Sequence, residues 1–167
     1  MEVTVTYLEM RELPTLPAAP PPRADLAVVQ AVKPTVSFYR YLYNTVGEQW
    51  RWVDRHKLSD EQLAAIIRDP AVEVYVLYVH GVPAGYAELD RRQFPDIELA
   101  YFGIMPEFIG RKLGPYLLRW SIDKAFSYSP RRLWLHTCTL DHPKALATYQ
   151  RAGFQIYSTE AKVVDDP

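Results

Sequence analysis

The sequence has a single cysteine, no long apolar run and almost no excess charge of either sign. The lone Cys138 excludes an internal disulfide framework. No apolar run approaches the roughly 20 residues that a membrane-spanning helix needs. The first residues also lack the charged, apolar and small-residue zones of a secretory signal. We therefore expect a cytoplasmic protein with no membrane partner.

Charge and metal-ligand content exclude further classes of protein. A net charge of −1 and an isoelectric point near 6.4 provide no basic field of the kind that attracts nucleic acid. Four scattered histidines and one cysteine do not form the clustered ligands that zinc requires. The dinucleotide G-x-G-x-x-G pattern and the Walker P-loop are also missing. We expect no nucleic-acid partner and no metal.

The sequence contains enough apolar material for one core. With 167 residues, 49% hydrophobic and 13% aromatic, it is expected to form a single domain over residues 1–167. We find no internal repeat. Five prolines between residues 14 and 22 cannot sit inside a helix or a sheet, so this stretch is predicted to be an extended surface loop.

Apolar periodicity divides the chain into strands and helices. It predicts strands over residues 2–10, 72–79, 84–90, 97–104, 132–139 and 155–164. It predicts helices over residues 35–46, 60–68 and 111–126, the second of them capped by Ser59 with Gln62. A last helix is expected to be capped by Asp141 or His142, to hold Pro143 in its first turn and to end at Gly153.

Residues 98–118 join an apolar strand to a glycine-containing loop and a helix. Gly110 and Gly114 allow close backbone approach, and Pro115 suits the first turn of the helix. The N–H groups that open a helix have no partner inside it, so an anion can bind them. The same spacing also occurs in plain strand-to-helix turns, which leaves two interpretations: a pyrophosphate loop or an ordinary connection.

Three segments, in chain order, resemble the GNAT superfamily of acyl-CoA-dependent N-acyltransferases. Residues 74–89 are similar to its central hairpin, and residues 97–118 to its acyl-CoA motif. Residues 135–154 are similar to the strand and helix that close its site, ending in A-x-x-x-Y-x-x-x-G-F. The resemblance implies an α/β (α+β) fold, with a mixed, mostly antiparallel central sheet of six or seven strands flanked by about four helices. It also implies acetyl-CoA as co-substrate.

The loop departs from the family pattern of Gln or Arg, two free positions, Gly, one free position, and Gly or Ala. Those three positions are Ile109, Lys112 and Gly114, where Lys112 keeps its backbone N–H and adds a cation. The resemblance implies that the backbone near Gly103 and Ile104 polarises the thioester if this strand splays from its neighbour. The residues that it implies as binding acetyl-CoA are Phe102, Gly103, Ile104, Ile109, Gly110, Arg111, Lys112, Leu113, Gly114, Pro115, His142 and Ala145.

Acyl transfer to an amine needs a neutral nucleophile, a stabilised oxyanion and a proton for the thiolate. Glu98 occupies a position where many family members carry a general base, and alternation places it on one face with Ala100 and Phe102. A carboxylate satisfied by an arginine is the alternative. Tyr149 matches the family tyrosine that protonates the thiolate, with a core aromatic as the alternative.

Two neighbouring residues are left out of the predicted catalytic set. His136 is expected to be a hydrogen-bonded or capping residue. Cys138 lies on an apolar strand, where a small buried side chain is the simpler interpretation than a covalent acyl carrier. Direct transfer in a ternary complex is therefore preferred.

The aromatic stretch before the hairpin is the expected acceptor site. Trp50 and Trp52 are predicted to hold a cationic amine by cation–π contact, with Glu88, Glu48 or Asp90 as counter-charge. We expect an N-acetyltransferase whose partner is a small-molecule amine. A protein or peptide N-acetyltransferase and a non-catalytic acyl-CoA-binding module are the alternatives. The resemblance also implies a possible homodimer, with contacts in the final strand or the proline-rich loop.

Overall fold

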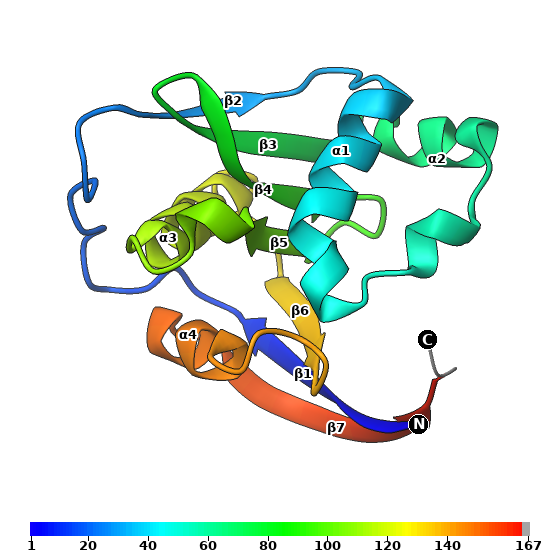
Figure 1. Cartoon of the computed structure of the whole chain (residues 1–167). Helices are drawn as coiled ribbons and strands as arrows, with labels where there is room; N and C mark the ends of the chain where they lie inside the picture. The colour runs from blue at the N-terminus through cyan, green and yellow to red at the C-terminus, as the bar shows by residue number, and fades with distance from the viewer. Residues whose placement is uncertain (165–167) are drawn as a thin grey trace.

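A seven-stranded sheet runs through the protein in the order β2-β3-β4-β5-β6-β1-β7 (Figure 1). This computed structural model describes residues 1–164. The strands are β1 (Glu2–Met10), β2 (Leu26–Gln30), β3 (Val72–Val79), β4 (Val82–Asp90), β5 (Asp96–Ile104), β6 (Arg132–Cys138) and β7 (Gln155–Val163). Among the strand pairs of these residues, only β5 with β6 is parallel. The expected mixed, mostly antiparallel sheet is confirmed.

Helices pack on both faces of this sheet (Figure 1). The α-helices of the described part of the chain are α1 (Val36–Gly47), α2 (Asp60–Ile67), α3 (Leu113–Phe126) and α4 (Ala145–Ala152). Short 3₁₀ turns are η1 (Glu48–Trp50), η2 (Asp54–Lys57) and η3 (Pro106–Phe108). One core lies between α1, α2 and the sheet, and a second lies between α3 and the opposite face.

Helix starts follow the expected capping chemistry in two places and not in a third. Thr35 accepts from the Phe38 N–H, and Ser59 forms a full capping box with Gln62. Neither Asp141 nor His142 is the N-cap of α4. The Asp141 carboxylate accepts from the Thr137 hydroxyl and the Cys138 N–H, whereas His142 Nδ1 accepts from the Lys144 N–H, one residue before the helix begins.

Helix α4 therefore begins later than predicted. Its N-cap is Lys144, which makes no side-chain capping bond, and Pro143 lies before its first turn. Its end is as predicted, since Gly153 adopts φ +114° in the left-handed region.

Two strands form the sheet edges. The short β2 was not predicted, because it begins only a few residues after the prolines and only its antiparallel pairing with β3 identifies it. The other edge is β7, which is exposed at all nine of its residues. Residues 14–22 lie outside helices and strands and are almost entirely exposed, as expected for a surface loop. Among residues 1–164, no helix has the length and apolar character to cross a membrane.

Candidate active site

The two parallel strands separate and leave a gap in the sheet. β5 and β6 pair only where residues 96–98 meet residues 132–134, although β5 continues to Ile104 and β6 to Cys138. Beyond Glu98 the β6-facing edge of β5 therefore has no strand partner (Figure 1). The splay that the sequence left undecided is present. A cavity of about 1530 Å³ occupies this gap and extends to both faces of the sheet.

One end of the cavity is the loop that leads into α3. Gly110 has φ +86° and Lys112 has φ +63°, so two left-handed residues turn the chain into the helix. Lys112 is the N-cap residue, and the first turn of α3 contains no acidic side chain. The first turn of α3, with its free N–H groups, and the cationic residue Lys112 therefore both line the cavity, and this end fits an anion such as a pyrophosphate.

Replacing Lys112 by glycine separates its backbone strain from its charge. We expect Lys112→Gly to raise the free energy of unfolding by about 1 kcal/mol, because glycine adopts a positive φ without the Cβ penalty. We also expect acetyl-CoA to bind about 3- to 10-fold more weakly, since one cation is lost. Thermal unfolding and calorimetric titration measure the two effects. Lys112→Ala is the control: it should weaken binding without the gain in stability. Unchanged affinity in Lys112→Gly would contradict a phosphate contact.

Glu98 lies at the centre of the gap, with acidic neighbours. It pairs with Asp90 across β4 and β5, and its side chain is 23% exposed. Burial, with repulsion from Asp90 and Glu88, raises the pKa of Glu98 from 4.5 to about 7. At neutral pH this carboxyl therefore exchanges a proton readily, which is what a general base for an amine requires.

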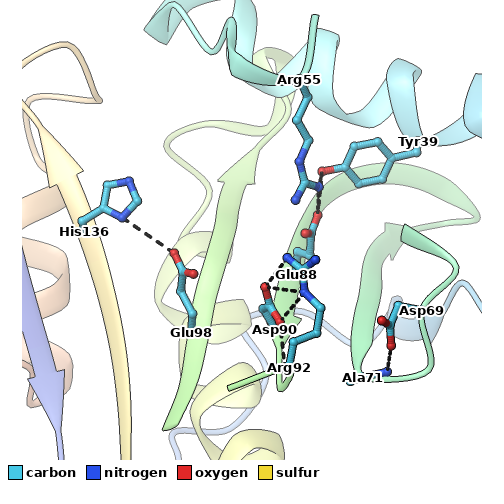
Figure 2. A network of polar contacts seen from close by, with 9 residues as sticks. All are labelled: Tyr39, Arg55, Asp69, Ala71, Glu88, Asp90, Arg92, Glu98 and His136. Carbon is cyan, nitrogen blue, oxygen red and sulfur yellow. Dashed lines mark hydrogen bonds and ion pairs between the residues drawn. The ribbon is translucent and has the colours of Figure 1, made fainter. Parts of the chain in front are cut away.

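His136 comes from β6 to meet Glu98 across the gap. Its Nδ1 lies 3.7 Å from Glu98 Oε2 (Figure 2). Burial, with a smaller contribution from the Lys162 charge, lowers the pKa of His136 below its usual 6.5, so the imidazole is mostly neutral at pH 7 and the contact is not an ion pair there. Sequence reasoning left this residue out. The alternation of β6 could have identified His136, because it places residues 134, 136 and 138 on the same, less buried side of the strand.

A β-bulge changes the faces of β5. Glu88 pairs with Tyr101 and Leu89 pairs with Leu99, so Ala100 is an extra residue on β5. The expectation that Glu98 and Phe102 share a face is therefore wrong. Phe102 packs with the α3 core, whereas Tyr101 packs with the α1 core. The cavity is thus lined by β5 side chains from both faces of the sheet.

Tyr149 of α4 lies on the cavity wall on the α3 side. Its ring centroid is 6.1 Å from that of Phe102 and 6.1 Å from that of Phe154. Burial, with a smaller contribution from the Asp141 charge, raises the pKa of the phenol above its ordinary value. The hydroxyl therefore stays protonated and can donate a proton.

Aromatic side chains line the opposite end of the cavity, where the sequence predicts the acceptor. Trp52 packs so closely on α1 that a Cβ at Gly47 would lie 2.6 Å from it. Its ring also lies 5.2 Å from Tyr101, between centroids. The Trp50 ring lies 5.0 Å from that of His142. Trp50 and His142 thus bridge the segment after α1 and the segment before α4.

The remaining predicted site residues fall into two groups. All of them line the cavity except Arg111 and Glu88. Arg111 lies over the Phe108 ring, 5.2 Å from its centroid. Glu88 is fully buried, and Oε1 accepts from Arg55 Nη1 at 2.8 Å, so its position argues against direct contact with an amine.

Cys138 is partly exposed on the cavity wall rather than buried. Within residues 1–164, no three His, Cys, Asp or Glu side chains gather as metal ligands.

The sequence profile of the acetyltransferase (GNAT) family matches residues 39–154, more than half of the chain and the part that holds the splayed strands, the α3 loop and Tyr149. The chain belongs to the GNAT family. No functionally curated protein matches the sequence.

Solved GNAT structures are similar to this chain in fold. A GCN5-related N-acetyltransferase from Sphaerobacter thermophilus has a TM-score of 0.67 at 14% identity, over 95% of this chain and 49% of its own. One from Kribbella flavida has a TM-score of 0.61 at 15% identity, over 95% of this chain and 56% of its own. This chain thus spans about half the length of each. An aminoglycoside acetyltransferase from an uncultured soil metagenomic sample, in complex with sisomicin, has a TM-score of 0.62 at 10% identity. This match covers 86% of this chain and 95% of the aminoglycoside acetyltransferase.

Proposed function

We propose that this GNAT domain transfers an acetyl group from acetyl-CoA to the primary amine of a small molecule, with both substrates bound at once. One observation carries the proposal: a single cavity joins the anion-binding loop before α3 to Glu98 through the gap between β5 and β6. A thioester held along the α3 side would reach the gap. An amine on the other side would meet it beside Glu98.

The transfer is a substitution at the thioester carbonyl. Glu98 takes a proton from the ammonium, directly or through water, and the free amine attacks the carbonyl carbon. A C–N bond forms and the C–S bond breaks. Backbone N–H groups on the unpaired edge of β5, near Gly103 and Ile104, stabilise the oxygen as it gains charge. Tyr149 gives its phenolic proton to the departing thiolate. The nitrogen of the new amide releases its second proton to water, and Tyr149 recovers a proton from water.

The aromatic end favours a compact acceptor over a peptide. The Trp50–His142 contact closes this end where an extended chain would need to pass. The rings of Trp52 and Tyr101 supply faces for cation–π contact with an ammonium. Asp90, also on the wall, carries a carboxylate, but Arg92 already donates to it, so Glu98 is the free carboxylate at this end.

Calorimetric titration tests the first half of the proposal. We expect micromolar binding of acetyl-CoA and much weaker binding of S-acetylpantetheine, which lacks the phosphates. A thiol-release assay over a panel of primary amines, with the product mass measured, then tests transfer. Binding of acetyl-CoA without acetylation of any amine would leave only an acyl-CoA-binding module.

Tyr149→Phe tests the proton donor. We expect kcat to fall about 10- to 100-fold, because the thiolate must then take its proton from water. Affinity for acetyl-CoA should not change, since the ring remains. Thiol release and calorimetry provide the two readouts. Tyr116→Phe, on α3 but off the cavity wall, is the matched control. Equal turnover in Tyr149→Phe and the wild type would assign Tyr149 to packing alone.

A further inference from the structure

Arg55 is a buried cation at the acceptor end of the cavity. It comes from η2, and its side chain is only 10% exposed. Its Nη1 donates to the Tyr39 hydroxyl at 2.6 Å and to Glu88 Oε1 at 2.8 Å (Figure 2). Both partners are themselves buried, so they hold the guanidinium from behind.

The other nitrogens of this guanidinium remain available as hydrogen-bond donors. Arginine carries five N–H donors in a rigid fork. Within the guanidinium of Arg55, only Nη1 makes hydrogen bonds to residues 1–164, so Nε and Nη2 have no protein acceptor there. The buried side-chain atoms that lack a hydrogen-bond partner in this part of the chain are Tyr86 Oη and Glu88 Oε2. Nε and Nη2 of Arg55 are not among them, so these two atoms are accessible rather than buried. Because Arg55 lines the cavity, its unused N–H groups reach that space.

A ring contact presets the direction of these donors, and the neighbouring arginine offers no comparable fork. The guanidinium carbon lies 4.7 Å from the centre of the Tyr101 ring, which fixes its plane. Arg92, the other arginine whose charge acts on Glu98, is already occupied: its Nε and Nη2 both donate to the Asp90 carboxylate. Of these two arginines, only Arg55 has an open fork.

An open, preset arginine fork matches a carboxylate in shape and charge. Glu98 lies on the same wall, and its carboxylate suits an ammonium. We propose that the acceptor is an amino acid or a similar molecule bearing a carboxylate beside its amine, and that Arg55 binds this carboxylate through Nε and Nη2. This inference rests on the proposed function, because it takes the acceptor to be an amine acetylated beside Glu98.

Matched pairs of amines test it by turnover. L-Phenylalanine is compared with 2-phenylethylamine, and L-leucine with isopentylamine, so that each pair differs only in the carboxylate. We expect kcat/KM to favour the amino acid by about 10- to 100-fold, the effect of a hydrogen-bonded charge pair. Equal rates, or a preference for the amines that lack a carboxylate, would overturn the inference while leaving amine acetylation intact.

Binding of the acetylated products gives a second readout that needs no turnover. N-acetyl-L-phenylalanine and N-acetyl-2-phenylethylamine are titrated by calorimetry, with the N-acetyl derivatives of the leucine pair beside them. Tighter binding of the carboxylate member without acetylation of any amine would support the Arg55 site and reject the proposed function. No preference in binding would reject the Arg55 site.

Variants assign the preference to Arg55. Arg55→Lys keeps the charge without the fork, and the double variant R55M/E88M removes the cation without leaving a buried carboxylate. We expect both to reduce the preference to less than about threefold. In Arg92→Met the preference should persist, because the Arg92 donors already bind Asp90. A preference that survives in both Arg55 variants would overturn the assignment.

Discussion

Glu98→Gln is expected to lower kcat/KM for amine acetylation by about 10²- to 10³-fold at pH 8, in the lower part of the range of about 10² to 10⁴ that general acid–base catalysis contributes. The amide cannot accept the proton that the ammonium must lose. It keeps nearly the same shape, so substrate packing is preserved. Thiol release under saturating acetyl-CoA measures the effect.

The pH profile links this loss to the carboxyl itself. With a pKa of about 7, Glu98 is mostly protonated at pH 6 and mostly ionised at pH 8, so the wild-type rate should rise about tenfold over this interval. Glu98→Gln should lose this rising limb. A limb near pH 7 that persists in Glu98→Gln would assign it to another group, with His136 as the nearest candidate.

Stability distinguishes lost chemistry from lost folding. The pKa of Glu98 is higher in the folded protein than in the unfolded chain, so the folded state binds its proton more tightly. Raising the pH from about 5 to 8 therefore costs folding free energy at this residue, and Glu98→Gln removes the cost. The variant should be at least as stable as the wild type at pH 8. Glu61→Gln, on the exposed side of α2, is the control and should retain full activity.

Arg55→Met is expected to destabilise the protein by about 3–5 kcal/mol, because it leaves a buried carboxylate without its cation. Glu88 is fully buried, and burial already raises its pKa despite Arg55. Without Arg55 the side chain must either remain charged in the interior or take up a proton. Urea unfolding at pH 7 measures the loss.

The double variant R55M/E88M gives the matching result. Two apolar side chains of similar volume should recover most of the lost free energy, since replacing both members of a buried pair is often neutral. Arg119→Met is the control: its partner Asp123 is 43% exposed, and the loss should stay below about 1 kcal/mol. A cost for Arg55→Met no larger than for Arg119→Met would show that the Glu88 site relaxes freely.

Local patterns determined most of the elements from the sequence alone. The strands over residues 2–10 and 72–79 agree with β1 and β3 residue for residue, because alternation reports burial on one face or two. The Ser59 capping box fixed the start of α2 through contacts that span three residues. The family order of hairpin, loop and closing helix predicted the sheet and the helices that cover it.

Contacts between distant residues decided the site. Sequence placed Glu98 and Phe102 on one face, but the extra residue Ala100 exists only in the register between β4 and β5. The sequence predicted that Glu88 contacts the acceptor, whereas the fold buries Glu88 against Arg55, which lies 33 residues away in the chain. Side-chain direction and pKa depend on neighbours across strands and on burial, neither of which a local pattern encodes. The elements thus follow from interactions within a few residues, and the arrangement of charged groups around the gap follows from the tertiary structure alone.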